Sequence, residues 1–94
     1  MYKNKACNGR NNISGINIAR IRKSLHPKVS QRALAANLQL VGLDLDKNAI
    51  QRIESGQRFV TDIELKVFAK ILDVDISELL NEEYEYHHNT SSKI

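Results

Sequence analysis

The sequence repeats one arrangement, in which a residue that caps helices stands directly before a short apolar segment. Ser30, Asp46 and Thr61 hold this place, and Glu64, three residues after Thr61, completes a capping box. Within each segment the apolar residues recur at intervals of three or four, which is the spacing of one face of an α-helix. Short helices are stabilised mainly by packing such faces against one another. The sequence therefore predicts an all-α fold without a sheet.

We expect five short helices. The first begins near Ile16 and ends before Pro27, because proline disfavours the helical conformation in the residue before it. The fifth runs from Ile76 to Leu80 and starts with Asp75 and Glu78, which repeat the capping box pattern. The residues expected to face the core are Ile18, Ile21, Leu25, Ala33, Leu34, Ala35, Leu38, Ala49, Ile50, Ile53, Leu65, Phe68, Ala69, Leu72, Leu79 and Leu80.

The segment from Leu43 to Asp46 alternates leucine and aspartate, which is the pattern of a half-buried β-strand. It is short, and the chain offers no second strand to pair with it. We interpret it as a connection in which Gly42 permits a turn and one or both leucines enter the core.

The length of 94 residues fits one small domain, because cores divide only beyond roughly 250 residues. A hydrophobic fraction of 41% with only 5% aromatic residues predicts an aliphatic core. We expect a mobile basic arm over residues 1–13, one domain over 14–81 and a polar tail over 82–94. No apolar run approaches the roughly 20 residues of a membrane-spanning helix, and the first residues lack the apolar region of a secretion signal, so we expect a cytoplasmic protein.

Charge is distributed unevenly along the chain. Residues 1–43 contain eight Lys and Arg and no Asp or Glu, whereas residues 44–94 contain six Lys and Arg against eleven Asp and Glu. A split of this kind suggests a cationic face that meets a polyanion. Charge alone leaves DNA, RNA and a membrane surface open, and it is also compatible with ordinary solvated helix faces.

The third expected helix, KNAIQRIESG, has polar residues opposite its apolar face and is stopped by Gly56. Asparagine and glutamine can bond adenine through two hydrogen bonds, arginine and lysine can bond guanine, and a helix fits the major groove of DNA. The candidate base-reading residues are Lys47, Asn48, Gln51 and Arg52. An ordinary solvated face is the alternative interpretation of these four residues.

Residues around this helix are candidates for supporting roles. Gln31 and Arg32, at the start of the second helix, can reach a phosphate or brace the third helix. Arg58, just after Gly56, can offer its guanidinium to phosphates. Glu54 follows the buried Ile53 and needs a cation, for which Arg22 is the best candidate.

These residues together resemble the Cro/repressor helix-turn-helix family, the XRE-type transcriptional regulators. The resemblance covers about residues 15 to 80 and is carried by Ser30-Gln31, Leu34-Ala35, Ile50, Ile53-Glu54, Gly56, Ala69, Leu72 and Ile76 to Leu80. It implies a compact, lambda-repressor-like bundle of five helices whose third helix enters the major groove, and a homodimer on a partly palindromic operator. It also implies that Gln31 contacts DNA backbone or base, and that Arg22 and Glu54 form an internal ion pair.

The sequence departs from the usual pattern of this family between the second and third helices. The connection from Gln39 to Asp46 is several residues longer than the usual turn, and the connection from Ser24 to Val29 is slightly long. We expect these lengths to affect the tilt of the third helix and therefore its base contacts, and not the fold. Asp44 and Asp46 also oppose close contact with phosphates, so we expect Asp46 either to use its charge as a cap or to tilt away from the DNA.

Other classes of function have weaker support in the sequence. No phosphate-binding glycine loop, zinc-ligand cluster or convergent Ser, His and Asp set occurs, so we expect neither an enzyme nor a cofactor or metal site. Cys7 has no second thiol near it, and His87-His88 have no third ligand. The alternative that we keep is a protein-interaction module, antitoxin-like or holding another regulator, supported by Asp44, Asp46 and the acidic tail. Tyr84 and Tyr86 could cover a dimer surface or belong to that tail, and single-stranded RNA binding is disfavoured by the scarcity of aromatic residues.

Overall fold

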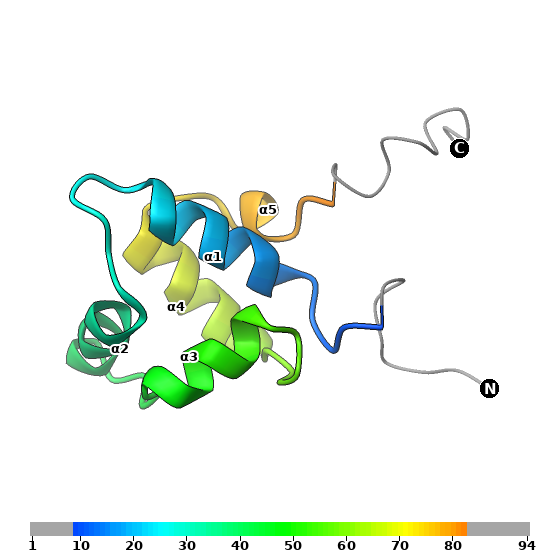
Figure 1. Ribbon diagram of the computed structural model, residues 1–94, viewed down its shortest axis with the longest axis horizontal. Coiled ribbons are helices and arrows are strands. Elements are labelled where there is room, and N and C mark those ends of the chain that lie inside the picture. The colour runs from blue at the N-terminus through cyan, green and yellow to red at the C-terminus, as the bar shows by residue number, and fades with distance from the viewer. Residues whose placement is uncertain (1–8, 83–94) are drawn as a thin grey trace.

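The computed structural model describes residues 9–82, which form five α-helices and, within that range, no β-strand (Figure 1). This confirms the expected all-α fold with five helices. The helices are α1 (Ser14–Ser24), α2 (Gln31–Leu40), α3 (Lys47–Glu54), α4 (Asp62–Leu72) and α5 (Ile76–Leu79).

Three of the expected helix caps are present as hydrogen bonds. The hydroxyl of Ser30 accepts a bond of 3.0 Å from the amide of Ala33, and the carboxylate of Asp46 accepts one of 2.8 Å from the amide of Ala49. Thr61 and Glu64 form the reciprocal capping box, with bonds of 3.1 and 3.0 Å. The starts of α2, α3 and α4 are therefore fixed by local side-chain chemistry.

Every helix contributes at least one fully buried side chain to a single core. These side chains are Ile18, Leu34, Leu38, Ile50, Ile53, Phe68 and Leu79. The connection between α2 and α3 turns at Gly42, whose φ of +92° is a conformation that glycine adopts without strain. Beyond this turn Leu45 is buried in the core and Leu43 packs partly against it, as expected for this segment.

Two expectations about α5 were wrong. Asp75 makes no side-chain cap, because the amide of Glu78, which the carboxylate would receive, donates to the backbone carbonyl of Asp75 at 2.9 Å. Leu80 remains 43% exposed, because it follows Leu79 directly and successive positions of a helix point about 100° apart.

Smaller differences concern residues that were expected in the core. Leu25 and Leu65 are only half-buried, and Ala33 is exposed at the start of α2. Helix α1 begins at Ser14, two residues before Ile16, because the side chain of Asn12 accepts a hydrogen bond of 2.8 Å from the amide of Gly15. The two additional residues bring the start of α1 close to the end of α3.

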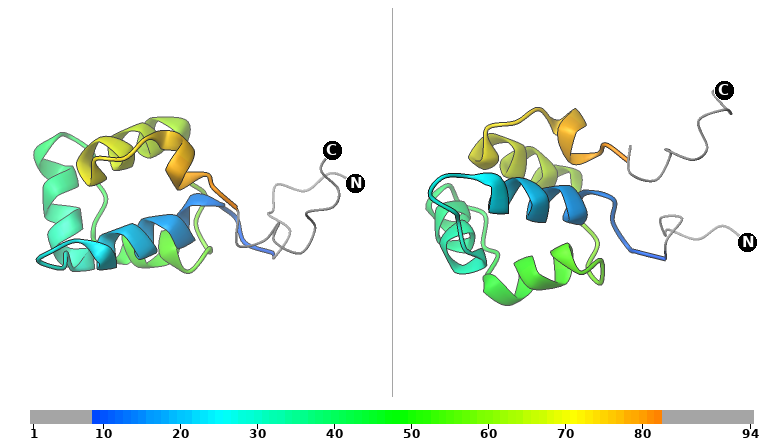
Figure 2. Two further views of the ribbon diagram at one scale, coloured as in Figure 1. Left: turned by 90° about the horizontal axis from the view of Figure 1, so that it is seen from above. Right: turned by 45° about the horizontal axis from the view of Figure 1, so that its top comes forward.

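Helix α1 lies between α3 and α5, and it is accompanied by α4 along one side (Figures 1 and 2). Helix α2 stands at one end of this arrangement, where it packs against α3 and α4. Consequently α3 has an outer face on the side of the molecule away from α5. That face is where the candidate base-reading residues lie.

Candidate nucleic-acid interface

Helix α3 separates buried apolar residues from exposed polar ones. Ala49, Ile50 and Ile53 are buried, in agreement with the apolar pattern of the sequence. The four residues expected on the opposite face, Lys47, Asn48, Gln51 and Arg52, are all exposed. Within residues 9–82 their side chains make no hydrogen bond or ion pair, so their donors and acceptors face solvent.

The two candidate residues at the start of α2 differ in their exposure and in their contacts. Arg32 is exposed, whereas Gln31 is half-buried and donates a hydrogen bond of 2.8 Å from Nε2 to Oε1 of Glu54. Of the two roles expected for Gln31, the contact favours bracing α3. Arg32 keeps its guanidinium in solvent beside the positive end of the α2 dipole, where it can meet a phosphate.

Arg22 and Glu54 form the ion pair that was expected. Nε of Arg22 lies 2.8 Å from Oε2 of Glu54, and Nη2 lies 2.9 Å from Oε1. Their side chains are 10% and 9% exposed, so the two charges are largely removed from water. Nη1 of Arg22 also donates to the backbone carbonyl of Val29 at 2.9 Å. Through this pair α1, the start of α2 and the end of α3 are bonded to one another.

Arg58 forms a second ion pair that the sequence did not indicate. Its Nη1 and Nη2 lie 3.0 and 3.1 Å from the two carboxylate oxygens of Glu64, whose Oε1 also belongs to the α4 capping box. Burial disfavours ionisation of Glu64, but hydrogen bonds from Arg58 and Thr61 outweigh it and hold the pKa of Glu64 below its ordinary value. The hydrogen bond with Glu64 raises the pKa of Arg58. A contact between Arg58 and phosphate, which stays a prediction, would compete with this pair.

The segment before α1 makes contacts that sequence reasoning missed. Residues 1–8 of the expected mobile arm lie outside the described residues, but Arg10, Asn11 and Asn12 are bonded to the end of α3. Arg10 donates to the carbonyls of Ile53 and Glu54 at 3.2 and 2.7 Å. The sequence signal was Asn12 itself, because asparagine is a preferred residue for receiving the free amides at the start of a helix, as Asn12 does for Gly15.

Gly15 allows α1 and α3 to approach closely at this point. A β-carbon on Gly15 would meet the carbonyl oxygen of Ile53, a guanidinium nitrogen of Arg10 at 2.7 Å and Oδ1 of Asn12 at 2.8 Å. Because one of these neighbours is backbone, the contact cannot be relieved by turning a side chain. The position therefore requires glycine.

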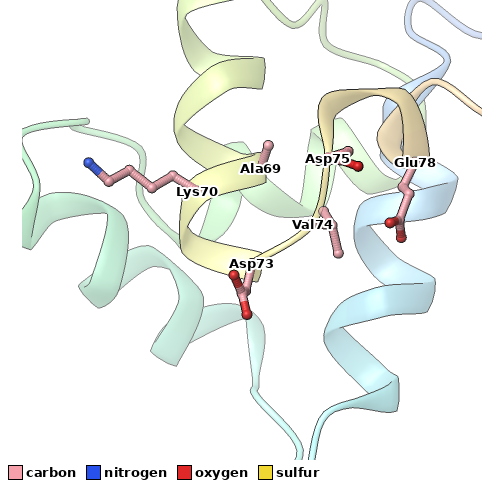
Figure 3. A pocket seen from close by; sticks show the side chains of 6 residues that line it. All are labelled: Ala69, Lys70, Asp73, Val74, Asp75 and Glu78. Carbon is pink, nitrogen blue, oxygen red and sulfur yellow. The ribbon is translucent and has the colours of Figure 1, made fainter.

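The corner between α4 and α5 carries an acidic pocket with a volume of about 330 Å³ (Figure 3). The side chain of Lys70 points away from the carboxylates of Asp75 and Glu78. The residues that line the pocket are Ala69, Lys70, Asp73, Val74, Asp75 and Glu78. No group of three His, Cys, Asp or Glu residues suited to a metal ion occurs among residues 9–82.

Several expectations concern residues outside the described range. These are the single thiol of Cys7, the pair His87-His88, and the tyrosines Tyr84 and Tyr86. Within residues 9–82 no helix has both the length and the apolar character needed to cross a membrane.

Comparisons with protein-family models, with curated proteins and with solved structures found no match. We therefore infer the function from the chemistry and the placement of the described residues.

Proposed function

We propose that this protein is a sequence-specific DNA-binding transcriptional regulator, a repressor that reads the major groove with α3 and requires no cofactor. The observation that carries the proposal is the outer face of α3. There the side chains of Lys47, Asn48, Gln51 and Arg52 present donors and acceptors to solvent, while the opposite face of the helix is buried in the core. Amide side chains suit adenine and cationic ones suit guanine, so this set can distinguish base pairs. A fold of the Cro/repressor type would place the same helix in the groove.

The anchoring of α3 supports a recognition role over an ordinary solvated face. Its start is capped by Asp46, its inner face is buried, and Glu54 at its end is held by Arg22 and Gln31. A reading helix has to keep its side chains in register with base edges, because hydrogen bonds weaken steeply outside a narrow range of distance and angle. This rigidity is what sequence discrimination needs.

The arrangement of charge also supports the proposal. Arg32, Lys47 and Arg52 are exposed on α2 and α3. The acidic pocket lies at the α4–α5 corner, and α1 lies between α5 and α3 (Figures 1 and 3). This polarity would orient the protein with α3 towards a polyanion. Asp46, which would repel phosphate, has its carboxylate bonded to the α3 backbone.

The exposed apolar side chains that follow α3 support assembly as a homodimer. Phe59 is 53% exposed, and Ile63, in the first turn of α4, is 69% exposed. Large apolar side chains that are exposed on a surface occur at many contacts between proteins. We assign them to the contact between two copies of the chain, which would present two α3 helices to a partly palindromic operator.

Selection of bound duplexes from a random DNA pool tests the proposal. The unaltered protein is compared with a Lys47→Ala/Arg52→Ala variant and with a Lys66→Ala/Lys70→Ala variant, which loses the same charge from exposed positions on α4. We expect a two-fold-related motif that the α3 variant loses and the α4 variant keeps. No enriched motif from folded protein would contradict the proposal.

A protein-interaction module is the second candidate function, favoured by two exposed apolar residues at the end of α2. Leu40 is 84% exposed and Val41 is 52% exposed. Neither residue belongs to the candidate DNA-reading face, so DNA binding does not explain their exposure. If the selection yields no motif, a partner protein held at this surface becomes the better explanation. Substitution of Leu40 by serine would then abolish capture of that partner, whereas the Lys47→Ala/Arg52→Ala variant would keep it.

A further inference from the structure

The last carbonyl groups of α3 are bonded by residues that precede α1. The final four carbonyls of any helix lack partners within the helix and need them elsewhere. In α3 the carbonyls of Gln51 and Arg52 accept bonds from the amides of Ser55 and Gln57, at 3.0 and 2.8 Å. The carbonyl of Ile53 accepts a bond of 3.1 Å from the amide of Gly56, and the carbonyls of Ile53 and Glu54 both accept bonds from the side chain of Arg10. The end of the candidate reading helix thus depends on a segment that is about forty residues distant in sequence.

Asn12 joins two helix ends through one carboxamide. Its Nδ2 donates to the carbonyl of Ile53 at 2.9 Å and to that of Arg58 at 2.7 Å. Its Oδ1 accepts the bond of 2.8 Å from the amide of Gly15 that starts α1. Asn12 is buried, so the loss of its Nδ2 donor would leave the Arg58 carbonyl without this partner, whereas the Ile53 carbonyl would keep its bonds from Arg10 and from the amide of Gly56.

Asn11 and Arg10 extend this contact on either side of Asn12. The backbone amide of Asn11 donates to the carbonyl of Gly56 at 2.8 Å, and its Nδ2 donates to that of Gln57 at 2.9 Å. The positive guanidinium of Arg10 lies at the negative end of the α3 dipole, which favours the contact electrostatically. Gly56 fits beneath Arg10, because a β-carbon there would lie 2.8 Å from the Arg10 side chain. Residues 10–12 are called the N-terminal clamp below.

We propose that the N-terminal clamp sets the tilt of α3, so that Arg10 and Asn12 are positioning residues for base reading. This inference rests on the proposed function for its consequence on DNA, and on the contacts of the clamp for its consequence on α3. An eight-residue helix is about 12 Å long, so a tilt of about 10° at one end displaces the other end by about 2 Å. Such a displacement exceeds the tolerance of a bidentate hydrogen bond to a base edge.

Two asparagines of this chain provide a matched pair of variants. Asn12→Asp removes the donor bond to Ile53 at the end of α3 and the donor bond to Arg58 in the loop that follows, and it keeps the acceptor for Gly15. Asn17→Asp removes two equivalent bonds, from Nδ2 of Asn17 to the carbonyls of Leu79 and Asn81 at 2.9 and 2.8 Å, and thereby acts on α5. Both asparagines are buried, and both variants add one negative charge. The two variants differ in the helix whose end loses hydrogen bonds, which is α3 for Asn12→Asp and α5 for Asn17→Asp.

The first measurement needs no DNA. Amide hydrogen exchange of the full chain is compared for both variants at a temperature where both are folded. Asn12→Asp is expected to lower the protection of Ser55, Gly56 and Gln57 by about tenfold relative to amides in α4, comparable to the loss of one buried hydrogen bond. Asn17→Asp is expected to lower the protection of Leu80 instead. If Asn12→Asp lowered the protection of Ser55, Gly56 and Gln57 no more than that of amides in α4, the proposal would be overturned.

The second measurement uses the duplex most enriched by the unaltered protein and a scrambled duplex of equal length and composition. Asn12→Asp is expected to lower the ratio of the two affinities by about tenfold, the worth of one good base contact, whereas Asn17→Asp keeps the ratio. An unchanged ratio in Asn12→Asp would overturn the positioning role. If the unaltered protein prefers no sequence, the proposed function fails, and hydrogen exchange alone decides whether the clamp holds α3.

Discussion

Glu54 on α3 and Arg22 on α1 form a bidentate ion pair in which both side chains are about nine-tenths buried, with charged atoms 2.8 and 2.9 Å apart. The pair connects the helix that carries the candidate DNA-reading side chains to the helix at the centre of the fold. Gln31 of α2 bonds the same carboxylate. One glutamate therefore links three helices around the site.

Removal of Glu54 is expected to destabilise the protein strongly. Glu54→Ala leaves the Arg22 guanidinium buried without its carboxylate, and breaking a buried pair in this way costs about 3–5 kcal/mol. The double variant Arg22→Met/Glu54→Leu removes both charges and should recover much of that loss. Urea unfolding of the three proteins provides the measurement. A single variant as stable as the unaltered protein would contradict the structural role of the pair.

Gly15→Ala separates helix propensity from packing. Alanine inside a helix is favoured over glycine by roughly 0.5–1 kcal/mol, so propensity alone predicts a more stable protein. The added methyl group would meet the Ile53 carbonyl and the clamp residues, and overpacking of this kind costs typically about 1–3 kcal/mol. We expect net destabilisation in thermal unfolding. A stabilised variant would show that α1 and α3 can move apart without cost.

The features that could be predicted from the sequence were those that depend on residues close together in the chain or on the chemistry of a single residue. The caps at Ser30, Asp46 and Thr61 act within three residues, and all three were predicted. The partner of Glu54 was also predictable, because a carboxylate next to a buried residue needs a cation.

The contacts that were not predicted join distant residues without a pattern. Asn12 bonds backbone carbonyls 41 and 46 residues away, and any residue type provides a carbonyl, so no sequence feature marks its partners. Arg58 and Glu64 each had another plausible role, as a phosphate ligand and as a capping residue. Their pairing appears only when the loop between α3 and α4 is placed.

The Arg58–Glu64 pair makes stability depend on pH in acid. Because the pKa of folded Glu64 lies below its ordinary value of 4.5, the ionised form stabilises the fold. This contribution is complete above the unfolded pKa and is lost as the pH falls through the lower folded pKa. Urea unfolding of the unaltered protein and of Glu64→Gln between pH 7 and about pH 2 should show their stability difference shrinking in acid. A constant difference would contradict the lowered pKa.

Ile63→Lys is expected to weaken self-association while leaving the fold intact, because the side chain is exposed and its replacement places a charge in the proposed dimer contact. Ile76→Lys is the control, since Ile76 is also exposed but belongs to α5. Analytical ultracentrifugation over a range of concentrations reports the dimer fraction. Equal dimer fractions in both variants would place the contact elsewhere.

The most direct test of base reading by α3 is selection of bound duplexes with Gln51→Ala alone, compared with the unaltered protein. Gln51 is exposed in the middle of the outer face, and its loss should remove one set of base contacts while the phosphate contacts persist. We predict that sequence preference relaxes at one base pair in each half-site, with a loss of discrimination of about 1–3 kcal/mol, and is unchanged elsewhere. A motif identical to that of the unaltered protein would contradict it.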